Sequence, residues 1–373
     1  MNIPYISLGL QHKEIKQDIL KSIEALLDSG QFILGEESQQ FEKSFAALAG
    51  TKYALGVANG TDALFLSMMA LGIGKGDEVI TAPNSFLASA SSVIIAGATP
   101  VFADVRADFN LDPEKVEKAI TPRTKAILAV HLTGRPAPLD ELLAIAKKHK
   151  IHLIEDAAQA VGASYKGKPV GSFGITGCFS LHPLKNLAAC GDGGVITTND
   201  EALYKYLLLA RNHGLKNRDE CVFFTYNSRL DNLQAAILNI KLKELNKWTE
   251  RRRAIATRYQ QAFKGLDMIL PADKDYEKAV YHTFIIQTGR RNELQQFLKN
   301  AGIDSKVHYP IAIHEQEAAR GLGYKKGDFP VTDRQVETIL SLPVYPELSD
   351  DQVDYICWQV QLFFSGKNKS DNL

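Results

Sequence analysis

The chain has 373 residues, which is long for a single hydrophobic core and predicts two domains. Its hydrophobic fraction of 45% and charged fraction of 23% are typical of a soluble globular protein. Lys plus Arg equal Asp plus Glu at 43 each, so no net charge favours binding to nucleic acid or to an anionic membrane.

Targeting and metal-binding patterns are not found in the sequence. The amino-terminal residues 1–5 lack the basic and apolar regions of a signal peptide, and no apolar run reaches the roughly 18 residues of a membrane span. The four cysteines, at 178, 190, 221 and 357, are too widely spaced for a metal site or a disulfide framework. We therefore expect a cytoplasmic protein with reduced thiols and no bound metal.

The first two thirds of the chain predict an α/β fold. Residues 12–49 carry two helical patterns, broken near residues 30–35. Apolar strand candidates follow at 53–57, 78–81, 100–103, 126–130, 152–155, 178–181 and 195–198. Helical patterns between them include 61–71, 85–96 and 138–148. This alternation predicts a large domain with a mostly parallel mixed sheet that is sandwiched by helices.

A long helical pattern at about 231–263 follows, and its charged run at 250–253 is expected on a solvated face. Because a helix of this length commonly bridges two domains, we place the boundary near residue 250. The large domain then comprises residues 1–250, and a smaller carboxy-terminal α/β domain comprises 251–373. The smaller domain is predicted to hold a strand at 281–287 and helices at 292–300 and 350–364, with a frayed polar end at 367–373.

A candidate phosphate site follows the first strand, in the motif Asn59-Gly60-Thr61. Gly60 would let the backbone approach an anion closely. Thr61 is expected to cap a helix whose free N–H groups favour a phosphate. Ser180, in the strand candidate 178–181, could add a second hydroxyl. Phe86 follows the strand 78–81 and could cover one face of a planar ring or be an ordinary core aromatic.

Two polar residues, Asp156 and Gln159, follow the strand candidate 152–155. Asp156 could keep the pyridine nitrogen of a cofactor protonated, as a buried carboxylate does in pyridoxal phosphate (PLP) enzymes. The amide of Gln159 could donate a hydrogen bond to the phenolic oxygen of the same ring. Asp156 could instead cap a helix over residues 157–161. Its neighbour Glu155 is more typical of a structural carboxylate.

Lys185 lies in the loop Ser180-Leu-His-Pro-Leu-Lys-Asn186, which Pro183 stiffens and glycines follow. Partial burial would lower the lysine pKa from about 10.4 and let the amine form a Schiff base with an aldehyde cofactor. Most lysines are surface residues, but a lysine, an acid and a glycine-threonine motif together indicate a PLP enzyme. His182 could act as an acid or base there, or only orient the loop. Arg229, His308 and Tyr309 lie in polar clusters without an evident core role and are candidate substrate contacts.

Three motifs carry a resemblance to a known family. They are Glu155-Asp156-Ala-Ala-Gln159, Phe179-Ser180-Leu-His182-Pro-Leu-Lys185-Asn186 and Asn227-Ser-Arg229-Leu230. Together with matches from Leu34-Gly35 to Ser341-Leu-Pro-Val-Tyr-Pro346, they resemble the DegT/DnrJ/EryC1/StrS family of PLP-dependent sugar aminotransferases, which has the aspartate-aminotransferase fold (fold type I). The resemblance covers nearly the whole chain.

The resemblance implies a role for each motif residue. Lys185 matches the Schiff-base lysine, Asp156 the partner of the pyridine nitrogen, and Gln159 the residue near the phenolic oxygen. An aromatic ring stacks on the cofactor where Phe86 stands. The residues that match the phosphate site are Gly60, Thr61, Ser180 and Asn227. The last of these reaches the phosphate from the neighbouring subunit, so the resemblance implies a homodimer with shared active sites.

The resemblance also implies the reaction, which is transfer of an amino group from glutamate to a nucleotide-linked keto-deoxysugar. The segment Asn227-Ser-Arg229-Leu230 is similar to the subgroup that aminates carbon 3, which we favour over carbon 4. An aminotransferase of a cyclic keto-cyclitol and a regulatory protein that holds PLP without turnover are alternatives. The sequence departs from the family at Thr225, Thr133 and Arg135, where glycine, tyrosine and glutamine are expected, and these differences could alter substrate fit.

Overall fold

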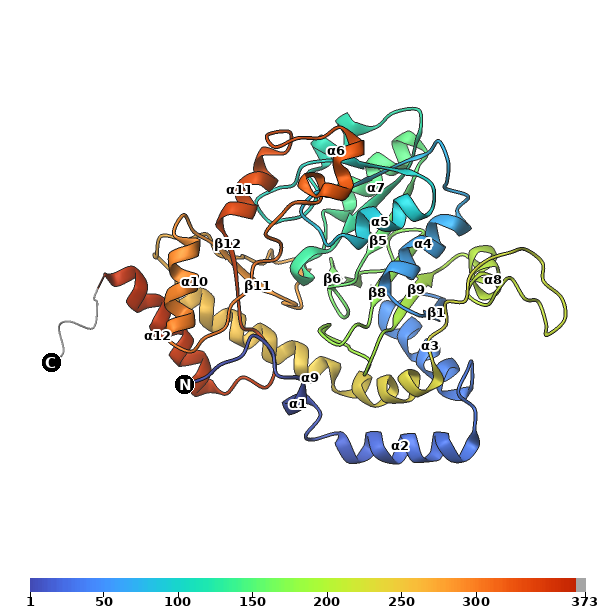
Figure 1. Ribbon diagram of the computed structural model, residues 1–373, viewed down its shortest axis with the longest axis horizontal. Coiled ribbons are helices and arrows are strands. Elements are labelled where there is room, and N and C mark those ends of the chain that lie inside the picture. The colour runs from blue at the N-terminus through green and yellow to red at the C-terminus, as the bar shows by residue number, and fades with distance from the viewer. Residues whose placement is uncertain (367–373) are drawn as a thin grey trace.

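The computed structural model describes residues 1–366 and is built around a seven-stranded sheet (Figure 1). In sheet order the strands are β1 (Tyr53–Val57), β9 (Gly194–Thr198), β8 (Thr176–Ser180), β5 (His152–Asp156), β4 (Thr124–Val130), β2 (Glu78–Thr81) and β3 (Thr99–Phe102). β9 pairs antiparallel with both of its neighbours, and the four pairs from β8 to β3 are parallel. The predicted mostly parallel mixed sheet is confirmed.

Helices cover both faces of this sheet (Figure 1). One face packs against α3 (Glu36–Ala49), α7 (Leu139–His149) and α9 (Asn232–Ala262), and the other against α4 (Gly60–Ala70), α5 (Ala88–Ile95) and α8 (Glu201–Ala210). Along β4, Ile127 points into the first core, whereas its neighbours Ala126 and Leu128 point into the second. Because both faces are buried, the strands carry continuous apolar runs instead of an alternating pattern.

A separate core lies around the antiparallel pair β11 (Phe284–Gln287) and β12 (Ile339–Leu342). The helices α10 (Arg291–Asn300) and α12 (Asp350–Ser365) pack in this region, and α11 (Pro330–Thr338) precedes β12. α9 contributes Leu245 to the core of the large sheet and Ile255 to this one. Ile3, from the amino-terminal segment, is also buried here. The domain boundary near residue 250 remains a prediction, and the expected frayed segment 367–373 lies outside the described residues.

The helix α2 and several shorter elements complete the described part of the chain. They are α1 (Leu8–Gln11), α2 (Lys16–Ser29), α6 (Pro113–Ala119), η1 (Leu132–Gly134), β6 (Ser164–Tyr165), β7 (Lys168–Pro169), β10 (Glu277–Lys278), η2 (Ile313–Glu315) and η3 (Glu317–Leu322). β10, β6 and β7 form a small sheet that joins the two parts of the chain. The strand predicted at 281–287 begins only at Phe284, because Tyr281 has a positive φ of 47° that interrupts extended backbone. Within residues 1–366, no helix has the length and apolar character needed to cross a membrane.

Candidate active site

The first turn of α4 and the end of β8 meet at one edge of the sheet. A Cβ atom at Gly60 would lie 2.7 Å from Cβ of Ser180, so only glycine allows this approach. The helix begins at Gly60, and its cap is Asn59, whose side-chain oxygen accepts a hydrogen bond from the N–H of Asp62 at 2.8 Å. The prediction that Thr61 is the cap is therefore wrong by two residues, because Asn59 has the extended backbone that a cap requires. Thr61 lies in the first turn instead.

Asp156 ends β5 with a side chain that is buried beside α5. Ser89 Oγ donates a hydrogen bond to Oδ2 at 2.8 Å, and the N–H of Ala158 donates to Oδ1 at 3.2 Å. Burial raises the pKa of Asp156, and these two hydrogen bonds and the positive charge of Lys185 partly oppose that rise. The alternative role as a helix cap is wrong, because residues 157–161 form turns and not a helix. Ser89 has no sequence signal that would have linked it to Asp156.

Glu155, in contrast, is a structural carboxylate as predicted. It is fully buried and accepts hydrogen bonds from the N–H groups of Gly171, Phe173 and Gly174, each at 2.7 Å. His131 Nε2 lies 3.0 Å from Oε2, the oxygen that also accepts from Gly171. The two adjacent acids of β5 therefore point to opposite faces of the sheet, and they have different environments.

Lys185 lies in the loop after β8, where its N–H donates to the carbonyl of His182 at 2.8 Å and closes a turn. Its side chain is half-buried, and this burial lowers the pKa of the amine to about 8, although the charge of Asp156 opposes the shift. His182 is exposed, and its Nδ1 accepts from the N–H of Leu184 at 3.3 Å. His182 therefore shapes the turn that presents Lys185.

Gln159, Tyr309 and Phe86 come together above this edge from three distant segments. Gln159 Oε1 accepts a hydrogen bond from the N–H of Thr133 at 2.7 Å, and its Nε2 donates to the Tyr309 hydroxyl at 3.4 Å. The centroid of the Phe86 ring lies 5.8 Å from that of Tyr309. Because Phe86 is 52% exposed, it is not an ordinary core aromatic. The arrangement leaves a partly open aromatic surface beside Asp156 and Lys185.

Two half-buried histidines line the same region. His308 Nδ1 lies 2.9 Å from Ser341 Oγ, and burial together with Lys185 and Lys306 lowers the pKa of His308 to about 4. His282 was not predicted as a site residue. Its Nδ1 lies 3.2 Å from Oδ1 of Asn186, and burial and the charge of Lys185 hold the pKa of His282 well below its usual value. Both imidazoles are neutral at pH 7, so they add no positive charge beside the lysine.

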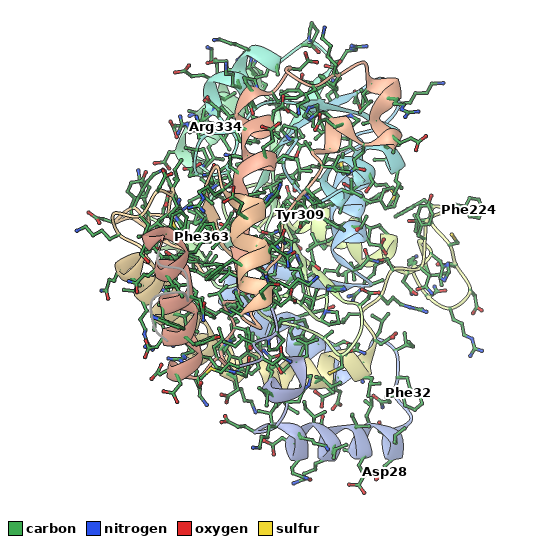
Figure 2. The ribbon with its side chains drawn as sticks, turned by 60° about the vertical axis from the view of Figure 1, so that its left-hand side comes forward. Asp28, Phe32, Phe224, Tyr309, Arg334 and Phe363 are labelled. Atoms are coloured by element: carbon green, nitrogen blue, oxygen red, sulfur yellow. The ribbon has the colours of Figure 1, made fainter. Side chains whose placement is uncertain are left out.

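Of the remaining predicted residues, Asn227 lies on a projecting loop, residues 212–228, at the side of the molecule (Figure 1), and Arg229 directly follows this loop. Figure 2 shows Phe224 at the outer part of this loop, where its side chain is 99% exposed. Asn227 is exposed, and its side chain takes part in no hydrogen bond among residues 1–366. Arg229 Nη1 donates to Oδ1 of Asn212 at 2.9 Å and holds the base of the loop. Within residues 1–366, neither the Asn227 nor the Arg229 side chain has a hydrogen bond to the residues around Lys185, although Ser228 between them donates to Asp62 Oδ2 in the first turn of α4.

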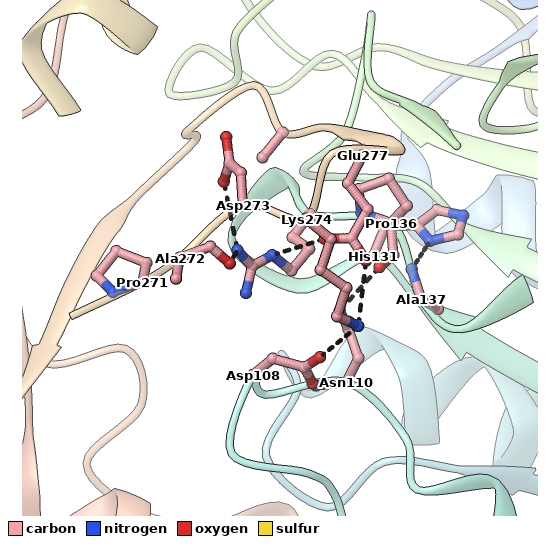
Figure 3. Close-up of polar contacts among 12 residues, drawn as sticks. Asp108, Asn110, His131, Pro136, Ala137, Pro271, Ala272, Asp273, Lys274 and Glu277 are labelled. Carbon is pink, nitrogen blue, oxygen red and sulfur yellow. Dashed lines mark hydrogen bonds and ion pairs between the residues drawn. The ribbon is translucent and has the colours of Figure 1, made fainter. Parts of the chain in front are cut away.

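Of the two departures near His131, Arg135 belongs to a partly buried ion-pair cluster, and Figure 3 shows polar contacts in this region. Thr133 has a positive φ of 64°, and its N–H is the donor to Gln159. Arg135 pairs with Asp273 at 3.3 Å and with Glu277 at 3.4 Å. These contacts tie the turn that holds Gln159 to Asp273 and to the start of β10.

Comparison with known proteins gives a consistent result. The profile of the DegT/DnrJ/EryC1/StrS aminotransferase family matches residues 13–361. A Geobacillus stearothermophilus protein named pleiotropic regulatory protein is 42% identical over 98% of this chain and 99% of its own. The dTDP-3-amino-3,4,6-trideoxy-alpha-D-glucose transaminase of Streptomyces venezuelae is 42% identical over 94% of this chain and 93% of its own. The crystal structure of S. venezuelae DesV with a ketimine intermediate has 40% identity and a TM-score of 0.96, covering 98% of this chain and 100% of that one. Other similar solved structures hold PLP or its amine form.

Proposed function

Since this chain belongs to the DegT/DnrJ/EryC1/StrS aminotransferase family, we propose that it aminates carbon 3 of a nucleotide-linked keto-deoxysugar, with glutamate as the amino donor. The family is PLP-dependent, and the chain is an aminotransferase. The observation that carries the proposal is the half-buried Lys185, with its lowered pKa, near the buried Asp156. The cytoplasmic location remains a prediction.

The residues at the sheet edge fit PLP. Gly60 and Ser180 are in contact, so the free N–H groups of the first turn of α4 and the serine hydroxyl are available to one phosphate. Asp156 is buried, and hydrogen bonds to both of its oxygens hold the carboxylate in place, which suits a partner of a protonated ring nitrogen. Phe86 is exposed enough to cover a ring, and Gln159 is held near it.

When bound, PLP supplies an electron sink and a carrier for the amino group. The chain's own residues hold and move protons around it. A pKa of about 8 leaves roughly one tenth of Lys185 neutral at pH 7, which allows Nζ both to accept and to return a proton. Asp156 would hold a proton at the ring nitrogen by charge. The neutral His282 and His308 avoid a repulsive charge that would depress the lysine further.

We place two chains in the active enzyme. Asn227 is exposed on the projecting loop, and so are the apolar side chains of Phe224 and Tyr226. Exposed apolar side chains on a loop that leaves the body of the protein are typical of a surface covered by another chain. A second copy of the chain would bring Asn227 to the phosphate site of its partner and Arg229 toward the substrate beside His308 and Tyr309.

The preference for carbon 3 rests on the segment that begins at Asn227 and on a 42% identical relative whose name describes a 3-amino sugar. The alternatives are a carbon-4 aminotransferase and an aminotransferase of a cyclic keto-cyclitol. A relative named as a regulatory protein is equally similar. The retained lysine and acid favour turnover over non-catalytic binding of PLP.

Two measurements test the proposal. Glutamate added to the holoenzyme should bleach the absorbance of the bound cofactor, whereas a non-catalytic binder would keep it. Coupled turnover should then be measured with a panel of nucleotide-linked 3-keto and 4-keto sugars and a keto-cyclitol. We expect the highest kcat/KM with a 3-keto sugar. A tenfold preference for a 4-keto sugar or for the cyclitol would overturn the assignment to carbon 3.

A further inference from the structure

Away from Lys185, a buried histidine lies opposite two acids. His314 in η2 has a side chain that is 0% exposed, and neither ring nitrogen has a hydrogen-bond partner among residues 1–366. Asp333 on α11 faces it, with its Oδ1 3.4 Å from His314 Nε2. This carboxylate oxygen is also buried without a hydrogen-bond partner in the described part of the chain. Buried polar atoms without partners are costly, so these three atoms indicate a missing ligand.

The geometry of these atoms matches a metal site. The side-chain atoms of His314, Glu315 and Asp333 that could bind a metal all lie within 4.8 Å of one another. In tetrahedral zinc sites the metal–nitrogen and metal–oxygen distances are about 2.0–2.2 Å, which places two ligand atoms about 3.4 Å apart. The distance between His314 Nε2 and Asp333 Oδ1 has this value. Glu315 is exposed and can reach the position by rotation of its side chain.

The surrounding residues fix these groups in place. The N–H of Gly327 donates to Oδ2 of Asp333 at 2.7 Å, which leaves Oδ1 directed at His314. The Phe329 ring packs edge-on against the imidazole, with centroids 4.7 Å apart. Outer contacts of this kind orient the ligands of metal sites. Apart from His314, no basic side chain within residues 1–366 forms an ion pair with Glu315 or Asp333, and Lys326, whose charge acts on both acids, pairs with Glu337 instead.

We propose that His314, Asp333 and Glu315 bind one Zn²⁺ ion, with water as a fourth ligand. One imidazole and two carboxylates suit zinc, whereas magnesium and calcium prefer oxygen ligands alone. The ion would join η2 to α11. The N–H of Ile313 donates to the carbonyl of Pro83 at 2.8 Å, so the same ion would fix the segment that follows Tyr309 against the strand end before Phe86. The site is structural and separate from the transfer of the amino group.

The test uses the zinc-free holoenzyme in equilibrium dialysis with ZnCl₂, together with thermal unfolding. We expect about one zinc ion per chain and a rise in Tm of a few degrees, on the order of 3 °C, because the metal binds only the folded state. His314→Gln and Asp333→Asn should each abolish both effects. Asp333→Asn keeps an acceptor for Gly327 and serves if the first variant does not fold. Glu337→Gln is the matched control, since Glu337 is an exposed acid of the same helix that pairs with Lys326 at 3.0 Å.

The proposal is overturned if the wild type binds no zinc, which would leave His314 and Asp333 as a simple ion pair. It is also overturned if both variants keep the full amount of zinc, because the metal would then be bound elsewhere, for example at the exposed Cys190 or Cys221. An equal loss of bound zinc in Glu337→Gln would also overturn the proposal, because zinc binding would then depend only on the negative charge of this surface.

Discussion

The two halves of the candidate active site differ in how far one chain completes them. Around Asp156 and Lys185, backbone hydrogen bonds and burial fix the side chains, and the pKa of each responds to the other. On the projecting loop, the side chains of Asn227 and Phe224 are exposed to solvent. The comparison shows that one half of the site depends on the fold of the chain, and we expect the other half to depend on association.

The largest expected effect is at Lys185, in the half of the site that one chain completes. Lys185→Ala should fold and dimerise but lose all amino transfer, since no other amine stands at this position. Lys185→Arg should be equally inactive, because a guanidinium stays charged and forms no imine. Coupled turnover at saturating substrates measures the loss, with circular dichroism as the control for folding. More than trace activity in either variant would exclude Lys185 as the catalytic residue.

The environment of Lys185 should also be visible in its chemistry. The pKa is lowered to about 8, so the neutral amine increases with pH and is half-formed near pH 8. At pH 7 it should be about 300-fold more abundant than for a lysine with a pKa of 10.5. The rate of cyanate modification in cofactor-free protein, followed by mass spectrometry, should reach half its maximum near pH 8. A midpoint near pH 10 would mean that the amine is solvated, and the exposed Lys216 provides the comparison.

A smaller loss is expected at Asp156. Asp156→Asn should retain PLP but slow turnover by about 100-fold, because the ring nitrogen loses its charged partner. Ser89→Ala removes only the hydrogen bond at 2.8 Å and should cost several-fold. Steady-state kinetics and the absorbance of bound cofactor give the two readouts. Activity of Asp156→Asn within about tenfold of wild type, or ~1.4 kcal/mol of barrier, would count against its role at the ring.

The smallest effect is expected for a substitution at Asn227, on the projecting loop. Asn227→Ala should weaken PLP retention several-fold and leave activity at saturating cofactor largely intact. Mixing this variant with inactive Lys185→Ala gives heterodimers with one doubly mutated site and one fully wild-type site. If Asn227 acts across the interface, mixing should restore normal PLP binding at half of the heterodimer sites. Activity that only averages the two parents, after subunit exchange has been demonstrated, would place Asn227 in the site of its own chain.

The sequence predicts the residues at strand ends well and those on distant elements poorly. Asp156 and Lys185 could be proposed because polar residues after apolar strands of a parallel sheet meet at one edge. The cap of α4 was misplaced because Asn59 and Thr61 are both suitable capping residues, and local backbone geometry decides between them. Ser89 and His282 carry no local pattern, since only tertiary packing brings them to Asp156 and Asn186. His314 and Asp333 are 19 positions apart and were missed for the same reason.

The helix α9 has a consequence for how the chain can be divided. It runs for 31 residues without a break, from the core of the large sheet into the core around β11 and β12. A cut near residue 250 would leave Leu245 and Ile255 on different fragments, and each fragment would expose an apolar helix face. We expect neither fragment to fold when it is expressed alone. The two cores should melt in a single calorimetric transition. A mutation that destabilises one core should therefore lower the Tm of both.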